Sequence, residues 1–544
     1  MNALAGAGRL ARLALRRDRI TLPVWIAGVT AVGFAVAASV ADLYGAESDR
    51  LAYAGTTAVS VVARAFNGPI SGAGLGSIVV AETFTSLAVL VALMTTFTVV
   101  RHTRQNEETG RFELTGSAMV GRHAPLAAAL AVAVGADLLI GAGVAAALVG
   151  LGLPVSGALT YGAALAGVGV AFAAVAAVTA QVFSTSRAAN SAAAIAVGVA
   201  FLLRAVGDAL GTVDADGLRV TSAWPSWLSP LGWANQVRPF DADHFGLLAL
   251  PAVFGVLAGT VAAVLVERRD AGTGLVAPRP GPARAGAGLR TATGLAWRLH
   301  RGGLLGWAIG LAVLGVAMGA VTDEVDALVG DNAGLADAIA QLGGTGGLVD
   351  AFLATIMSFV ALMVAGYAVQ AVLRAYVEEG AGRLEAVAAG AVSRSRWLGG
   401  HLACAAGGVL VLQALTGATI GLAYAATVDG TAGVMAETAR MTGAALAHAP
   451  AVFVLAGVVV AGFGLLPRWS AAIAWTALAL CALAGQFGAV LDLPAAVVNA
   501  SPFSHVPAVP VDEVTAGPLL ALLAVAAGLL AVGMVAFRRR DLAL

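Results

Sequence analysis

Residues 101–122, RHTRQNEETGRFELTGSAMVGR, form a long polar segment with twenty or more mostly apolar residues on each side. A membrane-spanning helix needs ~20 consecutive apolar residues, so the segment is predicted to connect two spans. Its four arginines favour the cytosolic side, where the loops of membrane proteins are enriched in basic residues. A Glu-Glu pair and a Gly-Arg-x-Glu motif lie within it, formed by Glu107, Glu108, Gly110, Arg111 and Glu113.

The composition extends this prediction to the whole chain. Hydrophobic residues make up 59% of the 544 residues and charged residues 11%, whereas ordinary soluble domains carry roughly 25% charged residues. The mean hydropathy is +0.88. These values predict an all-α polytopic membrane protein. About 12 transmembrane helices are expected, near residues 20–41, 78–100, 125–150, 157–182, 188–207, 246–266, 302–322, 350–373, 399–426, 446–466, 469–489 and 516–537.

The polar motif recurs in the second half of the chain. The second copy is formed by Glu378, Glu379, Gly382, Arg383 and Glu385, with one extra residue between its glutamates and its Gly-Arg. The two Gly-Arg-x-Glu motifs are 272 residues apart, half of the chain, and the same spacing separates Arg122 from Arg394 and Ser229 from Ser501. Three matches at one spacing predict two fused six-helix repeats. Because an even number of spans returns the chain to the same side, the repeats are expected to be parallel.

The arginines also predict the topology. If the N-terminus is cytosolic, 25 of the 31 arginines fall on the cytosolic side, and the opposite loops are acidic. Both termini are therefore expected in the cytosol, in a multi-pass protein of the cytoplasmic (inner) membrane. Residues 1–266 are predicted to form the first half with an N-terminal elbow helix, 267–301 a cytosolic linker with a second elbow helix, and 302–544 the second half. The elbows could lie along the membrane surface, or their arginines could only set the topology.

The chain has no lysine, because all 31 basic residues are arginine. A Walker A phosphate loop needs its lysine to reach the β- and γ-phosphates of ATP. Any ATP and Mg²⁺ are therefore expected to be bound by a partner ATPase, with no cofactor held by this chain. The sequence also offers no His/Cys cluster with metal-ligand spacing, and it indicates neither an enzyme nor a nucleic-acid-binding protein.

These features together resemble the permeases of ABC-2 type exporters. They are six spans per unit, an elbow, a Glu-Glu-x-Gly-Arg-x-Glu loop after the second span and an outer Ser-Pro segment before the sixth. The fused two-unit length is most similar to actinobacterial permeases of polyketide-antibiotic exporters, including the tetronasin type. The resemblance implies export of a hydrophobic or amphipathic compound, powered by separate cytosolic ATP-binding subunits, two copies per permease chain.

The resemblance also implies a role for the duplicated loop. Each copy would hold a coupling helix, over about residues 111–120 and 383–392, that docks into the ATPase. The coupling role would fall on Glu107, Glu108, Gly110, Arg111 and Glu113, and on Glu378, Glu379, Gly382, Arg383 and Glu385.

A segment on the opposite side, residues 224–245, is rich in tryptophan and proline, and residues 501–505 match part of it at the repeat spacing. Tryptophan favours the membrane interface, and closely spaced prolines forbid a simple span. By the resemblance, these segments form short re-entrant helices that gate the outer exit; the alternative is an interfacial aromatic belt. The candidate gate residues are Trp224, Trp227, Ser229, Pro230 and Trp233 in the first half and Ser501, Pro502, Phe503 and His505 in the second.

Asp137 is predicted to lie near the middle of the third span, where an ionisable side chain costs at least ~2.5 kcal/mol. It could contact a substrate or relay a proton, or it could be a protonated carboxyl group bonded to a neighbouring helix. The leading prediction is therefore the permease subunit of an ATP-driven exporter. The alternative is a proton-coupled secondary transporter that uses Asp137. A membrane enzyme or a scaffold without transport is a third class, without a catalytic constellation to support it.

Overall fold

The computed structural model describes residues 3–111, 113, 119–270, 272–276, 281, 283–330, 345–427, 433–487 and 494–541. Among these residues, twelve helical segments are long and apolar enough to span a membrane, which confirms the prediction of an all-α polytopic membrane protein. The chain divides into two compact units, Met1–Pro280 and Gly281–Leu544, with the boundary inside the predicted linker. Each unit contains six of the twelve segments.

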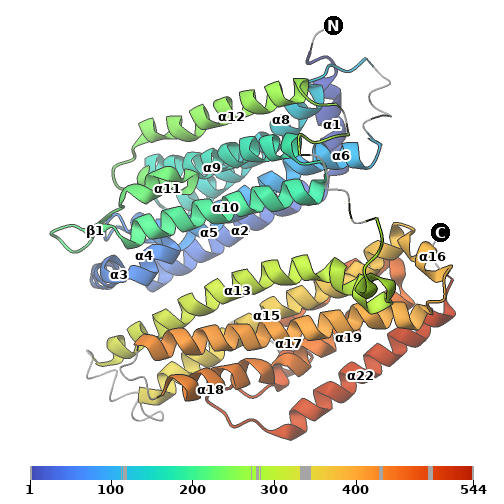
Figure 1. The fold of residues 1–544 in the computed structure, drawn as a ribbon. Helices are drawn as coiled ribbons and strands as arrows, with labels where there is room; N and C mark the ends of the chain where they lie inside the picture. The colour runs from blue at the N-terminus through green and yellow to red at the C-terminus, as the bar shows by residue number, and fades with distance from the viewer. Residues whose placement is uncertain are drawn as a thin grey trace. The chain divides into compact units, whose positions relative to one another are not determined.

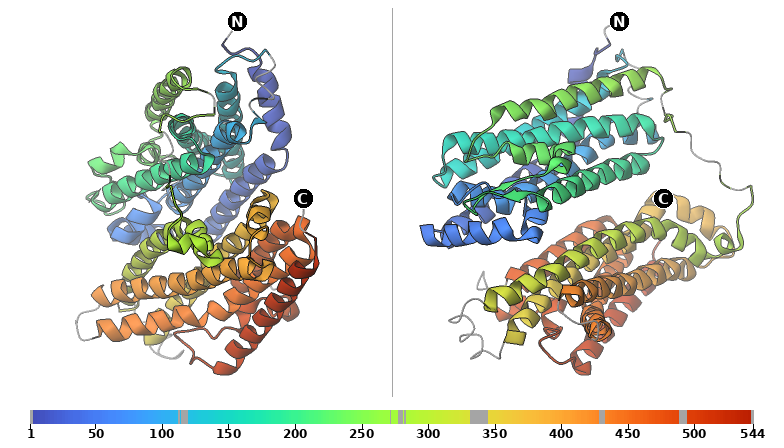
Figure 2. Two further views of the ribbon diagram at one scale, coloured as in Figure 1. Left: turned by 45° about the vertical axis from the view of Figure 1, so that its right-hand side comes forward. Right: turned by 60° about the vertical axis from the view of Figure 1, so that its left-hand side comes forward.

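The spans of unit 1 run side by side along one axis of the unit (Figures 1 and 2). They are α2 (Thr21–Leu43), α5 (Leu75–His102) with α6 (Arg104–Glu108), α8 (Ala124–Gly150), α9 (Val155–Val182), α10 (Ser186–Ala209), and the 3-10 helix η2 (Phe245–Leu248) with α12 (Ala249–Glu267). The shorter elements are α1 (Ala7–Arg17), α3 (Glu47–Val59), α4 (Val61–Asn67), the antiparallel strands β1 (Thr212–Val213) and β2 (Val220–Thr221), η1 (Trp224–Leu228) and α11 (Pro230–Gln236). Helices α1 and α6 lie at one end of the unit, and α3, α4 and the hairpin lie at the other (Figure 1).

Unit 2 has a similar order of elements. Its spans are α13 (Ala292–Gly330), α15 (Thr345–Gly380), α17 (Arg394–Thr427), α18 (Val434–Ala447) with α19 (Ala449–Leu465), η4 (Pro467–Trp469) with α20 (Ser470–Phe487), and α22 (Ala516–Arg539). The shorter elements are η3 (Ala287–Arg290), α16 (Arg383–Ala388), α21 (Ala495–Val498) and η5 (Pro502–His505). Helix α16 and the end of α22 lie at the same end of unit 2 (Figure 1).

The second and fourth spans are the most buried in each unit. In unit 1, Phe84 of α5 and Tyr161 of α9 pack edge to face with their ring centroids 5.1 Å apart. Gly141 of α8 and Gly162 of α9 face each other so closely that a Cβ on either would collide with the carbonyl oxygen of the other. Small residues at crossing points allow membrane helices to approach in this way, which explains the glycines at this crossing.

The first predicted elbow is a separate helix, but the second is not. Helix α1 ends at Arg17, and a turn at Asp18 separates it from α2, whose first turn contains Pro23. The residues of the second elbow, Trp297, Arg298 and Arg301, belong instead to α13, which runs from Ala292 without a break. Residues 292–322 contain no proline, so nothing interrupts the helical hydrogen bonds there.

Candidate functional site

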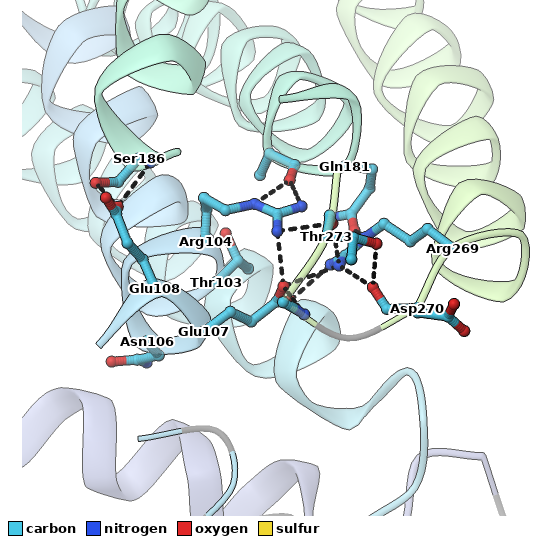
Figure 3. A network of polar contacts seen from close by, with 12 residues as sticks. Thr103, Arg104, Asn106, Glu107, Glu108, Gln181, Ser186, Arg269, Asp270 and Thr273 are labelled. Atoms are coloured by element: carbon cyan, nitrogen blue, oxygen red, sulfur yellow. Dashed lines mark hydrogen bonds and ion pairs between the residues drawn. The ribbon is translucent and has the colours of Figure 1, made fainter. Parts of the chain in front are cut away.

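Glu107 is the centre of a polar network at the α6 end of unit 1 (Figure 3). A turn at Thr103 ends α5, and α6 then places the Glu107 carboxylate beside Arg269, which follows α12. Two nitrogens of Arg269 donate to the two carboxylate oxygens at 2.6 and 2.8 Å, and the amide of Gly272 donates at 3.2 Å. A bidentate ion pair of this kind fixes geometry as well as adding energy. The end of the second span is thereby fixed to the end of the sixth.

Arg104 joins the same network from its buried side. Its guanidinium, which is 0% exposed, donates to the Glu107 carboxylate at 2.9 Å. It also donates to the carbonyl of Ala180 at 2.5 and 2.8 Å and to the carbonyl of Thr273 at 2.9 Å. A buried charge of this kind needs an ionic partner and further hydrogen bonds to offset its desolvation. Arg104 therefore holds α6 against the end of α9 and against residues 272–276.

Unit 2 contains an equivalent ion pair. Glu379, in the last turn of α15, accepts from two nitrogens of Arg540 at 2.6 and 2.8 Å. The guanidinium of Arg540 also lies over the rings of Phe463 and Phe537, 5.0 and 5.1 Å from their centroids. Glu379 follows Glu107 by the repeat spacing of 272 residues. In both units, an ion pair thus joins the end of the second span to the end of the sixth.

A second arginine stabilises the end of the sixth span in both units. Arg394 donates to the carbonyl of Arg540 at 2.7 Å. The last carbonyls of a helix lack intrahelical partners and carry partial negative charge, so a guanidinium is well suited to bind them. In unit 1, Arg122 binds three carbonyls at 2.9–3.1 Å, those of Val266, Glu267 and Arg269. The spacing that matched Arg122 with Arg394 in the sequence therefore reflects a shared structural contact.

The other glutamate of each Glu-Glu pair, Glu108 or Glu378, has different partners. Glu108 accepts from the amide and the hydroxyl of Ser186, at 2.9 and 2.5 Å, and so caps the start of α10. Glu378 accepts from Arg383 at 2.7 and 3.0 Å and lies 3.3 Å from Arg374. The hydrogen bond with Glu378 raises the pKa of Arg383. Glu107, Glu108, Glu378 and Glu379 all lie at the ends of helices rather than in an open loop.

The rest of each motif faces solvent. Gly110 and Gly382 have φ of +69° and +71°, a left-handed conformation that favours glycine, and each precedes a helical residue. The predicted helix at 383–392 is shorter, since α16 ends at Ala388, and most of the predicted helix at 111–120 lies outside the described residues. The exposed charged side chains of the two motifs are Glu108, which caps α10, and Arg111, Glu113, Arg383 and Glu385.

The two Ser-Pro segments share one local structure. Ser229 and Ser501 are both buried. The Ser229 hydroxyl accepts from two backbone amides of the following turn, and the Ser501 hydroxyl accepts from one, that of Phe503. The hydroxyl of Ser229 also donates to the carbonyl of Ala200 in α10 at 2.7 Å. The turn that begins at Pro230 is the helix α11, whereas the turn that begins at Pro502 is only the 3-10 helix η5. Both segments are short helices that differ in length, and whether they re-enter the membrane stays a prediction.

The aromatic residues of these segments fall into exposed and packed groups. Trp224 is 73% exposed and Trp227 is 43% exposed. The indole nitrogen of Trp233 donates to the carbonyl of Trp227 at 2.6 Å, and its ring packs edge to face on Phe254 of α12. In unit 2, Phe503 packs on the hydrophobic core and the ring of His505 lies 2.9 Å from the carbonyl of Asn499. Whether any of them acts as a gate stays a prediction.

Asp137 lies in α8, enclosed by neighbouring helices of unit 1. Its side chain is 0% exposed, and the hydroxyl of Thr95 in α5 donates to Oδ1 at 2.5 Å. Gly169 of α9 packs so closely that a Cβ there would collide with the carboxyl group. Three packed helices therefore surround Asp137. Of the possibilities that the sequence left open for Asp137, these contacts match a carboxyl group that is hydrogen-bonded to a neighbouring helix.

Sequence reasoning missed another buried ion pair, near the C-terminal end of α10. Arg204 and Asp208 are both 0% exposed and lie 3.1 Å apart. Arg204 also donates to the carbonyls of Ala65 and Phe66 near the end of α4, at 2.5 and 3.1 Å. Their spacing of four residues, which places both side chains on one helix face, was the available signal.

An α-helical protein of two related six-span units is typical of membrane transporters. The family described as "Multidrug efflux system permease Rv1217c, C-terminal domain" matches residues 289–538. The chain is 39% identical over 542 residues to the "Multidrug efflux system permease protein Rv1217c" of Mycobacterium tuberculosis, covering 99% of this chain and 96% of that protein. The chain therefore belongs to the family of multidrug efflux system permeases. The expected permease is confirmed, whereas the polyketide-antibiotic and tetronasin type is not what these matches name.

Proposed function

We propose that this chain is the permease subunit of an ATP-driven exporter that moves hydrophobic or amphipathic drug-like compounds out across the cytoplasmic membrane. Both termini would be cytosolic, and ATP and Mg²⁺ would be bound by two copies of a separate ATPase subunit. The chain supplies no lysine for a Walker A loop, which supports a separate ATPase. The multidrug efflux named for its relative supports the class of substrate.

The observation that carries the proposal is the duplicated loop. Each copy exposes an arginine and a glutamate to solvent and is joined, through an ion pair, to the end of the sixth span of its unit. A partner that docks on Arg111 or Arg383 and moves the loop would therefore move the second and sixth spans together. Glu107 and Glu379 would transmit this motion, while the exposed residues would contact the ATPase.

We expect the double charge reversal Arg111→Glu with Arg383→Glu to lower ATP-dependent drug export about tenfold or more. The new glutamates would repel the groups of the ATPase that the two arginines are proposed to contact, and like charges brought together at an interface cost several kcal/mol. Export of a fluorescent drug from cells and ATP hydrolysis by the purified complex are the two readouts. Arg298→Glu with Arg301→Glu is a matched control, since both arginines are exposed at the start of α13. Unchanged export by the Arg111 and Arg383 variant, at normal membrane levels, would contradict the proposed docking.

Asp137→Asn separates this proposal from a proton-coupled transporter. Asparagine has nearly the same shape as aspartate and can accept the hydrogen bond of Thr95, so we expect export to stay within about twofold of the original protein. A transporter that carries protons through Asp137 would instead lose export, because the amide does not titrate. The measurement is drug export from cells with and without a protonophore, at equal amounts of protein in the membrane.

A further inference from the structure

A cavity of about 680 Å³ lies at the α6 end of unit 1. Its walls come from α1, from the end of α5 with α6, from the start of α8 and from the end of α12. Small-molecule sites in proteins usually have volumes of about 300–1,000 Å³. The cavity is therefore large enough for a ligand, and the proposed docking of an ATPase on the exposed loop gives no reason for it.

One part of the cavity wall is apolar. Leu10 and Leu13 of α1 line it, together with Pro125 and Leu126 at the start of α8 and Val266 of α12. Leu13 is 45% exposed although it lies on a helix that packs on α8. These side chains offer a surface of several adjacent aliphatic groups to the apolar part of a ligand, and covering them would remove apolar area from water.

Another part of the wall is positively charged. Among the described residues that line it, the carboxylates are Glu107 and Asp270, and Glu107 is already paired with Arg104 and Arg269. Burial, and then the positive charges of Arg111 and Arg101, lower the pKa of Arg17. Four arginines line the cavity: Arg17, Arg111, Arg122 and Arg269. The lining thus carries excess positive charge, and an anion would offset the repulsion felt by Arg17.

We infer that this cavity binds an anionic amphiphile, whose acidic group lies beside Arg17 and Arg111 and whose apolar part covers Leu10 and Leu13. Basic pockets between membrane helices on the cytosolic side are known to suit acidic lipid head groups. The same chemistry could come from an acidic phospholipid of the inner leaflet or from a free acidic amphiphile in the cytosol. Arg17, which donates to the amide oxygen of Asn106 at 2.7 Å, is already oriented by α6.

Native mass spectrometry of the full chain in neutral detergent tests this inference, with phosphatidylglycerol, oleate and phosphatidylcholine as probes. We expect phosphatidylglycerol, oleate or both to bind at least about tenfold more tightly than phosphatidylcholine. Arg17→Gln should weaken that binding about tenfold. Arg16→Gln is the matched control, since Arg16 is the exposed neighbour on the same helix and does not line the cavity, so its effect should stay below about twofold.

The pattern of binding identifies the source of the ligand. Tight binding of phosphatidylglycerol alone would assign a membrane lipid, and tight binding of oleate alone would assign a free amphiphile. Leu13→Glu places a carboxylate at an exposed position of the cavity wall and should repel either probe even if Arg17→Gln does not fold. Equal binding of anionic and zwitterionic probes, equal effects of Arg17→Gln and Arg16→Gln, or full binding by Leu13→Glu would overturn the inference.

Discussion

Glu107→Ala is expected to lower the free energy of unfolding of unit 1 by about 3–5 kcal/mol, the usual cost of removing one partner from a buried ion pair. The loss is large because the two arginines paired with Glu107 stay buried without an anion. Arg104 is 0% exposed and Arg269 is 7% exposed. Residues 272–276 also lose the hydrogen bond from the amide of Gly272. Under the proposed function, drug export should fall with it, because the second and sixth spans would no longer move together.

Denaturation of the purified protein in detergent measures this loss, and protease cleavage at residues 272–276 reports on the local contacts. Glu113→Ala is the control, because Glu113 belongs to the same motif but is exposed. Glu379→Ala should destabilise unit 2 in the same direction. If Glu107→Ala and Glu113→Ala lower the free energy of unfolding equally, the ion pair between Glu107 and Arg269 does not hold the loop in place.

The sequence predicted the spans well because bilayer thickness sets their length, and each span is a local property of the chain. The repeat spacing of 272 residues also located the two loops. It did not locate their partners, since Glu107 and Arg269 are 162 residues apart and Glu379 and Arg540 are 161 apart. Contacts of that separation depend on how the spans pack, which periodicity and composition do not specify.

The alignment of the two motifs also changes once their contacts are known. The sequence pairs the two Glu-Glu dipeptides and leaves one extra residue before Gly382. The ion pairs instead match Glu107 with Glu379, at the repeat spacing, and leave Glu108 without a glutamate counterpart in unit 2. No residue is then extra, and the difference between the loops lies in Glu108 and Glu378, which have unrelated partners.

In α10 of unit 1, Arg204→Met is expected to be about as destabilising as Glu107→Ala. Asp208 would remain buried without its cation, which costs about 3–5 kcal/mol, and the carbonyls of Ala65 and Phe66 would lose their donor. The double variant Arg204→Met with Asp208→Leu should recover most of this loss, since it leaves no charge in the buried site and replacing a whole buried ion pair by apolar residues is often neutral. Only the missing donor to the two carbonyls would then remain, at a net cost of about 0.5–1.5 kcal/mol for a hydrogen bond.

The measurement is the unfolding midpoint of the single and double variants in one detergent, which gives the coupling between the two positions. We expect the original protein to be the most stable, the double variant to be next and Arg204→Met to be the least stable. This order would assign the loss to an uncompensated carboxylate. A double variant as unstable as Arg204→Met would instead assign it to the contacts between Arg204 and the end of α4, which would make Arg204 mainly a helix cap that holds α4 against α10.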